Sequence, residues 1–167
     1  IQFVQQFKYL GQIISSNGLL KGEISQRVGK ATYAFNQLLM RGIWTDKTIR
    51  RKTKLTIYKA IVRSILLYGV ETWPISIKDV KRLETAQMGF VRRICGYPLW
   101  EPGPSFQEIR ARYELPSIKD MIRYHRLRWF GHVNRQDHAE LPWCTLFGRI
   151  DGPLLVGRHQ RTWVDAI

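Results

Sequence analysis

Basic side chains crowd together around residue 50, and their chemistry is the clearest in the sequence. Four cations fall within two helical turns: Lys47, Arg50, Arg51 and Lys54. Side chains three or four positions apart share a helix face, so these charges repel one another unless an anion lies opposite. Lys and Arg bind the phosphates of nucleic acids and release counterions as they do so. We therefore expect phosphate contacts here, and the alternative is a solvated face with no specific role.

A second group combines basic and aromatic side chains further along the chain. Its members are Arg123, Arg126, Arg128, Trp129, His132 and Arg135. Aromatic rings stack on bases while arginines hold phosphates, so this composition is typical of nucleic-acid binding. Trp129 also lies in line with Ile118, which favours a core position for its ring and leaves Arg126 and Arg128 as contacts. A tail that is expected to order on binding repeats the pattern with Arg158, Arg161 and Trp163.

Acidic, histidine and cysteine side chains are too scattered for a metal site or a catalytic centre. The aspartates stand apart at positions 46, 79, 120, 137, 151 and 165, whereas two-metal phosphoryl transfer needs carboxylates held close together. The candidate zinc ligands have spacings that match none of the usual patterns. They are Cys95, His125, His132, Cys144 and His159. Since no Gly-x-Ser-x-Gly nucleophile elbow is present either, we expect no catalytic residue and no bound metal in this chain.

The overall charge of the chain indicates a polyanionic partner. Its 167 residues include 27 Lys and Arg against 13 Asp and Glu, which gives a formal net charge of +14. Nucleic acid is the expected partner of so basic a protein. An acidic membrane surface is the alternative, but the basic residues are spread along several amphipathic stretches instead of flanking one apolar anchor. We therefore expect no membrane partner.

The cysteines and the first residues indicate in which cellular compartment the protein is expected. Cys95 and Cys144 form no CxxC pair, which fits buried thiols in a reducing, intracellular environment. No stretch approaches the roughly 20 apolar residues of a membrane span. The opening residues lack a signal peptide's basic start and apolar run, and they read like the middle of a strand without an initiator Met. These features suggest a fragment of a longer protein.

The elements that must position these side chains are mainly helical, after a short β segment. Residues 3–14 alternate weakly and are expected to form a strand or hairpin arm, closed by a turn at Asn17-Gly18. The period then becomes helical, and Gly42 is expected to be the C-cap residue because glycine adopts positive φ freely. The apolar stripe of this first helix is Ile24, Val28, Ala31, Phe35, Leu38 and Leu39.

Two further helices are expected before residue 97. Thr45 or Asp46 is a suitable cap for the second helix, whose apolar line runs to about residue 67. A third helix is expected from about Ile77 to Gly96. Together the three helices would make a bundle that carries the basic cluster on its second member.

The segment 97–105 holds three prolines and a glycine, so it is the best candidate boundary in the chain. Two shorter helices are predicted after it, over residues 105–113 and, with Ser117 as the cap, over about 118–131. Regular periodicity fades from Asn134 onward. The predicted fold is therefore mainly α, with an N-terminal strand or hairpin, a three-helix bundle, and a smaller helical C-terminal segment with an irregular tail.

Short strings spread over nearly the whole chain form a recognisable series. They include Phe7-Lys8-Tyr9-Leu10-Gly11, Leu67-Tyr68-Gly69-Val70-Glu71-Thr72-Trp73, Arg128-Trp129-Phe130-Gly131-His132-Val133 and Gly157-Arg158-His159-Gln160-Arg161-Thr162-Trp163. In this order and at these distances they resemble the C-terminal part of the reverse transcriptase in LINE-type, RTE-like non-LTR retrotransposons. The resemblance implies a nucleic-acid-binding piece of an RNA-directed DNA polymerase.

The resemblance also implies a domain organisation with a role for each part. Residues 1–18 would be the end of the polymerase palm, 19–96 a thumb-like bundle, and 97–167 a C-terminal extension. Its implied primer grip is Lys8, Tyr9, Leu10 and Gly11. Its implied backbone contacts in the thumb are Lys21, Arg27, Lys30, Lys47, Arg50, Arg51 and Lys54. The resemblance does not settle the role of the extension.

The implied partners are an RNA/DNA template–primer and the upstream palm of the same polyprotein. The family's catalytic carboxylates and their Mg²⁺ ions would belong to that palm, so this chain is not expected to be catalytic alone. The implied location is the cytoplasm and, for integration, the nucleus. Two alternatives from other classes stay open: a degenerate or domesticated helical protein-interaction module, and a complete small nuclease.

Overall fold

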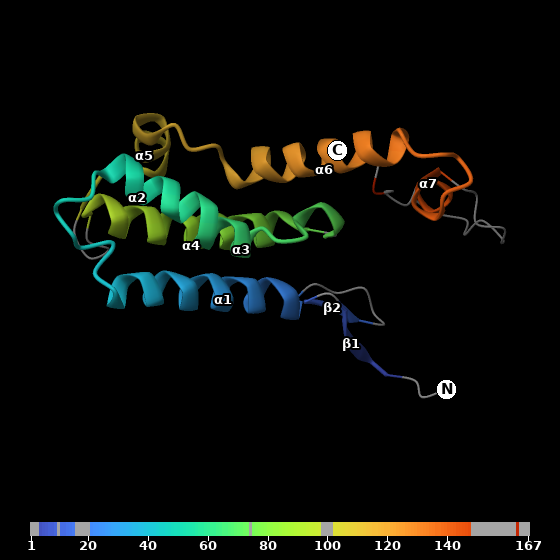
Figure 1. Cartoon of the computed structure of the whole chain (residues 1–167), viewed down its shortest axis with the longest axis horizontal. Coiled ribbons are helices and arrows are strands. Elements are labelled where there is room, and N and C mark those ends of the chain that lie inside the picture. Colours follow the sequence, from blue (N-terminus) through green and yellow to red (C-terminus); the bar gives the residue numbers. More distant parts are fainter. Residues whose placement is uncertain are drawn as a thin grey trace.

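The computed structural model is mainly helical, which confirms the predicted fold class (Figure 1). It describes residues 4–9, 11–15, 21–73, 75–97, 102–147 and 163. The hairpin strands are β1 (Gln6–Tyr9) and β2 (Gln12–Ser15). The helices are α1 (Lys21–Met40), α2 (Arg51–Ile57), α3 (Ser64–Leu66), α4 (Ile77–Cys95), α5 (Phe106–Tyr113), α6 (Ile118–Asn134) and α7 (Leu141–Phe147). Among the described residues, no helix combines the length and apolar character needed to cross a membrane.

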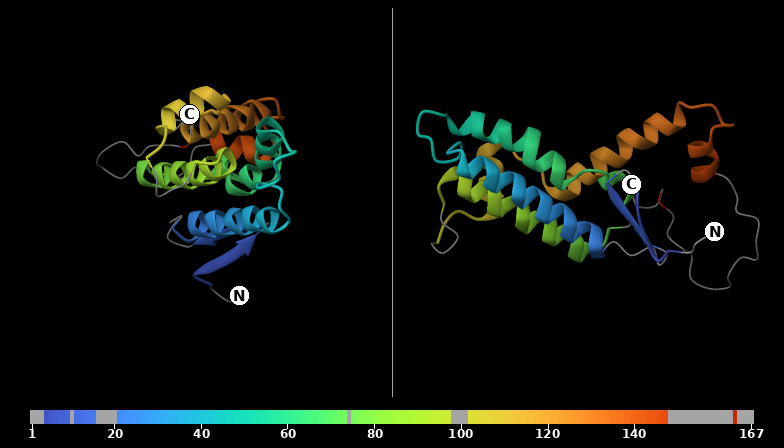
Figure 2. Two further views of the ribbon diagram at one scale, coloured as in Figure 1. Left: turned by 90° about the vertical axis from the view of Figure 1, so that its left-hand side faces the viewer. Right: turned by 60° about the horizontal axis from the view of Figure 1, so that its bottom comes forward.

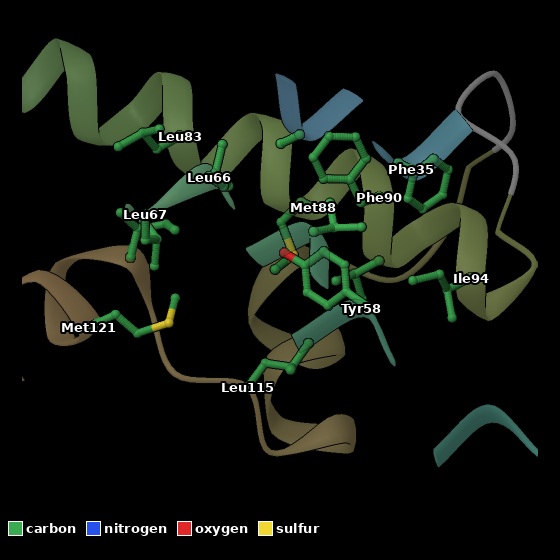
Figure 3. Close-up of a cluster of buried hydrophobic side chains, with 14 of the residues drawn as sticks. Phe35, Tyr58, Leu66, Leu67, Leu83, Met88, Phe90, Ile94, Leu115 and Met121 are labelled. Carbon is green, nitrogen blue, oxygen red and sulfur yellow. The ribbon is translucent and has the colours of Figure 1, made fainter. Parts of the chain in front are cut away.

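Three long helical segments pack side by side: α1, the continuous helix that α2 and α3 share, and α4 (Figures 1 and 2). Aromatic rings fill the space between them. The Phe35 ring stacks on Trp44 and on Phe90, with centroids 5.1 and 4.9 Å apart. Tyr58 also lies against Phe90, and Figure 3 shows Phe35, Phe90 and Tyr58 together in the core. Burial of such large apolar side chains is the main stabilising contribution to a bundle of this kind.

The helices after residue 97 contribute to the same core. Ile109 of α5, Leu115, and Met121 of α6 are buried in one cluster with the side chains of the bundle. Figure 3 shows Leu115 and Met121 in this cluster. The later half of α6 then extends past the bundle toward α7 (Figure 1). The described residues on both sides of the 97–105 connection therefore share one hydrophobic core.

Three helices begin with a serine cap, and at α4 and α5 the cap is a full capping box. Ser76, Ser105 and Ser117 each accept a hydrogen bond from the backbone N–H three residues on. The residues at those third positions are all acidic: Asp79, Glu108 and Asp120. Each serine is bonded in turn to the carboxylate of its acidic partner. At α4 and α5 the carboxylate accepts from the serine's own backbone N–H, which satisfies a group that the first helical turn otherwise leaves open, whereas at α6 it accepts from the Ser117 hydroxyl. The acids of these caps are thus committed to local structure and not to cationic partners.

The two expected glycine C-caps are confirmed. Gly42 follows α1 with φ +75°, and Gly96 follows α4 with φ +77°. This left-handed conformation is strained for residues with a Cβ, which explains why glycine ends both helices. The segment from α1 to the end of α4 therefore has the boundaries that the apolar periodicity predicts, apart from the start of the second helix.

That start is a correction, because α2 begins at Arg51 and not at Thr45 or Asp46. The Asp46 carboxylate accepts hydrogen bonds from the backbone N–H and the hydroxyl of Thr48, both at 2.7 Å. An aspartate bonded two residues on forms a local turn, which competes with helix formation. The helix α7 is a second correction, since no regular element was expected after residue 134.

The hairpin closes earlier than the sequence suggested. Tyr9 pairs with Gln12, so the strands join around Gly11, which has φ +82°. Glycine tolerates this conformation and is typical of two-residue hairpin turns. The Asn17-Gly18 dipeptide that was expected to close the arm lies outside the described residues.

A π-helical turn, Tyr58–Arg63, interrupts the helix between α2 and α3. Tyr58, Val62 and Leu66 are fully buried at successive four-residue steps. In an α-helix each such step advances roughly 40° beyond a full turn, so three residues spaced in this way still lie within one apolar stripe. Single π-helical turns are frequent at functional sites.

Candidate nucleic-acid interface

Arg27 is one of the expected backbone contacts, and the structure assigns it a different role. Only 5% of it is exposed. Its Nε donates to Glu23 Oε1 at 2.6 Å, and its Nη2 donates to the Gly11 carbonyl oxygen at 2.7 Å. The guanidinium also lies 4.5 Å from the centre of the Tyr68 ring, within the range of a cation–π contact. Arg27 therefore joins the hairpin turn, α1 and the segment after α3, and it is not a phosphate contact.

Lys54 and Arg126 are corrected in the same way. Lys54 is 7% exposed and donates from Nζ to the Trp44 carbonyl oxygen at 2.8 Å. Arg126 is 6% exposed and donates from Nη2 to the Trp73 carbonyl oxygen at 2.7 Å. Burial lowers the pKa of the Arg126 guanidinium. A buried cation needs such hydrogen bonds to offset its lost hydration, so these side chains stabilise the fold.

The remaining cations of the basic cluster are exposed at the start of α2. They are Lys47, Arg50 and Arg51, together with Lys52, which the sequence interpretation did not include. Unlike α4, α5 and α6, α2 has no acidic residue in its first turn and no side-chain cap. The positive end of the helix dipole thus adds to the cations instead of being neutralised. The nearest acid in sequence, Asp46, has its pKa lowered by the hydrogen bonds from Thr48 and is ionised at neutral pH.

A pocket of about 390 Å³ lies beside the later half of α6. Its lining residues are Glu71, His125, Arg128, Trp129, His132 and Arg135. Trp163 lies next to it, because its ring meets the ring of Trp129 edge-on with centroids 4.7 Å apart. The Trp163 Nε1 donates to the Glu71 carbonyl oxygen at 2.8 Å. The expected contacts Arg128 and Trp129 therefore lie beside two residues that are distant in the sequence, Glu71 and Trp163.

A larger groove of about 980 Å³ runs between the π-helical turn and α6. Its cationic residues, Lys59 and Arg63, come from the π-helical turn, and its acids are Glu71 and Asp120. Tyr124, which is 62% exposed, lines it from α6. The sequence interpretation missed Lys59 and Arg63 as surface cations. The signal that could have revealed them is the unbroken four-residue spacing of the apolar side chains on the other face of the helix.

For the remaining expected nucleic-acid contacts, the structure gives a position in the fold but no indication of a role. Lys30 is half-buried and donates to Gln26 Oε1 at 3.0 Å. Lys8 and Tyr9 lie in β1, Gly11 in the hairpin turn, and Lys21 at the first position of α1. Leu10, Arg158 and Arg161 lie outside the described residues. The primer-grip assignment therefore stays a prediction.

The two cationic regions are not brought together. The start of α2 lies near one end of the molecule's long axis, and the later half of α6 lies toward the other (Figures 1 and 2). Within the described residues the ion pairs are Arg27–Glu23 and Arg110–Glu84, so acids neutralise few of the surface cations.

No three histidine, cysteine or acidic side chains gather as metal ligands in the part of the chain that the structure describes. Cys95 is buried in the bundle, where burial raises the pKa of its thiol, whereas Cys144 is exposed on α7. A thiol with a raised pKa is a weak nucleophile and a weak ligand, because the thiolate is the reactive form.

The comparison with known proteins gives one distant relative. A putative uncharacterized transposon-derived protein of Caenorhabditis elegans is 26% identical over 170 residues, which cover 98% of this chain. The chain spans 59% of the length of that relative. No protein-family model and no solved structure matches the chain. The similarity supports an origin related to transposons.

Proposed function

We propose that this chain is the nucleic-acid-binding C-terminal part of a retrotransposon RNA-directed DNA polymerase and that it grips the template–primer. The observation that carries the proposal is the exposed set Lys47, Arg50 and Arg51 at a helix start without acidic residues. These side chains can contact phosphates without rearranging the core. The transposon-derived relative, the net charge of +14 and the resemblance of the sequence strings support the same conclusion.

Under this proposal the chain supplies positioning, and an upstream polymerase domain supplies the metal ions and the chemistry. Contacts between Lys or Arg and phosphates fix a duplex in place but carry little sequence information. The hairpin around Gly11 would lie at the primer, and the bundle would lie along the duplex. Affinity that comes mainly from phosphates falls steeply as salt rises.

Fluorescence anisotropy with a labelled RNA/DNA hybrid tests the proposal. If about six phosphates are engaged, the logarithm of the binding constant should fall against the logarithm of the salt concentration with a slope near −5. Arg50→Gln combined with Arg51→Gln should make the slope about two units shallower. The matched control is Lys78→Gln with Lys81→Gln, which removes two exposed charges near the start of α4 and should leave the slope unchanged. A wild-type slope near zero would contradict the proposal.

A protein-interaction module is the second candidate, and one surface favours it. A groove of about 720 Å³ between α1 and α3 is lined mainly by apolar atoms of Tyr33, Ala34, Ile65 and Tyr68. Exposed apolar surface of this kind is typical of protein contacts. The two candidates differ in the anisotropy experiment, because a stable fold that binds no hybrid, RNA or DNA at low salt would favour the interaction module.

A further inference from the structure

The pocket beside α6 has the dimensions and the composition of a small-ligand site. Its volume of about 390 Å³ is near the lower end for such pockets. Two chain segments line it: the turn after α3, through Glu71, and α6 itself. Trp163, 92 residues from Glu71 in sequence, secures the arrangement through its hydrogen bond to the Glu71 carbonyl. This convergence of segments distinguishes the pocket from an incidental hollow on one helix surface.

Its side chains combine permanent positive charge with an aromatic surface. Arg128 of α6 and Arg135, which directly follows the helix, are exposed and stand about two turns apart, about 10 Å along the helix axis. Trp129 lies between them in sequence and is half-buried, so part of its ring faces the pocket. An arginine offers several N–H donors in a plane that matches phosphate oxygens. An indole offers a face on which a base can stack.

We propose that this pocket holds one unpaired nucleotide of a nucleic-acid strand, with its base against Trp129 and the flanking phosphates on Arg128 and Arg135. The proposal rests on the nucleic-acid-binding function proposed above. A base within a duplex is covered on both faces by its neighbours and cannot offer one to an indole. A pocket of about 390 Å³ can admit one nucleotide. The Glu71 carboxylate can accept a hydrogen bond from an amino group or a sugar hydroxyl.

Two further contacts hold the pocket in shape. Arg126 donates to the Trp73 carbonyl oxygen and so fixes α6 against the turn that carries Glu71. Gly131 faces the Arg135 side chain, since a Cβ added there would lie 3.3 Å from Arg135 Nη1. The glycine therefore leaves room for the guanidinium to lie close along the helix. Both residues position the pocket without contacting the nucleotide.

The test compares three labelled RNA/DNA hybrids by anisotropy with the whole chain. One is blunt, one carries a short single-stranded overhang, and one carries the same overhang with abasic sugars. Wild-type protein should bind the normal overhang roughly tenfold tighter than the blunt hybrid, because stacking of one base contributes on that scale. The abasic overhang, which keeps the phosphates for Arg128 and Arg135 but offers no base to Trp129, should bind more weakly than the normal overhang. Equal affinity for the normal and the abasic overhang would overturn the proposal, since phosphate attraction alone would then explain the binding.

Two double variants test whether the preference for the overhang arises at this pocket. Arg128→Gln with Arg135→Gln should lower the ratio of overhang to blunt affinity clearly below ten, because the flanking phosphates lose their partners, whereas Lys78→Gln with Lys81→Gln should leave the ratio near ten. A ratio that persists in the first variant would overturn the assignment of this pocket while leaving the general grip intact. Loss of binding to all three hybrids by the wild type would instead contradict the proposed function and the pocket with it. The abasic comparison uses only wild-type protein and does not depend on how the variants fold.

Discussion

The ammonium group of Lys54 lies 2.8 Å from the carbonyl oxygen of Trp44, and both residues are buried. Trp44 is held in turn by a hydrogen bond from its Nε1 to the Phe35 carbonyl oxygen at 2.9 Å. The two bonds connect α1, the turn after it and the start of the next helix in series. Lys54 thus differs in role from the exposed cations that precede it by only a few residues.

Replacement of Lys54 tests that difference. Lys54→Met keeps the length of the side chain but leaves the Trp44 carbonyl without its donor, which should lower the free energy of unfolding by about 1–3 kcal/mol. The exposed neighbour provides the control, since Lys52→Met should change it by less than about 0.5 kcal/mol. Urea denaturation measures both. The salt dependence of hybrid binding should be the same for folded Lys54→Met as for the wild type, and a shallower slope would return Lys54 to the phosphate contacts.

The buried pair of Arg27 and Glu23 should be strongly coupled. Arg27→Met leaves the Glu23 carboxylate buried without its cation, which should cost about 3–5 kcal/mol of unfolding free energy. Adding Glu23→Leu should recover much of that loss, because two apolar side chains can replace a buried ion pair. A double-mutant cycle by chemical denaturation gives the coupling energy. Additive effects of the two substitutions would mean that the pair is not a unit.

Acid should weaken the start of α5 through Glu108. Hydrogen bonds from the backbone N–H and the hydroxyl of Ser105 lower the pKa of Glu108 below its ordinary 4.5. The folded state therefore favours the charged form, and the resulting stabilisation is complete above about pH 4.5 and is lost as pH falls through the lowered pKa. Glu108→Gln should flatten this part of the curve of stability against pH, measured by urea denaturation. Superimposable acid limbs for the variant and the wild type would contradict the role of Glu108.

Trp163 should stabilise the contact between the tail and the turn that carries Glu71. Trp163→Phe removes the N–H donor but keeps a ring, so it should cost about 0.5–1.5 kcal/mol. Trp163→Ala also removes the edge-on contact with Trp129 and should cost roughly 1 kcal/mol more. Thermal and urea unfolding measure both losses. If the alanine variant were as stable as the wild type, Trp163 would not secure the pocket.

Local patterns were sufficient to predict most helices. In α1, Ile24, Ala31 and Phe35 are fully buried, as their three- and four-residue spacing predicts. The caps at Ser105 and Ser117 are also local, since each involves a serine and the residue three positions on. These elements could be predicted because the interactions that define them connect residues close together in the sequence.

The buried cations could not be predicted in this way. Arg27, Lys54 and Arg126 bond to carbonyl oxygens that lie 16, 10 and 53 residues away, so composition alone makes them resemble surface charges. The pocket beside α6 could not be predicted for the same reason, because it depends on a hydrogen bond between Trp163 and Glu71, which are 92 residues apart in the sequence. Sequence proximity identified Arg128 and Trp129 as candidates, but only the fold shows which distant side chains accompany them.

The bond between Arg27 and the hairpin has a mechanical consequence. It attaches the hairpin turn to one end of a rigid bundle, and α1, with 20 residues, extends about 30 Å from there. The turn that leads to the exposed cations of α2 lies at the other end of α1 (Figure 1). Over that length a tilt of about 10° at the hairpin would displace the far end of α1 by about 5 Å, so a small change at the hairpin would be felt as a large one at the start of α2.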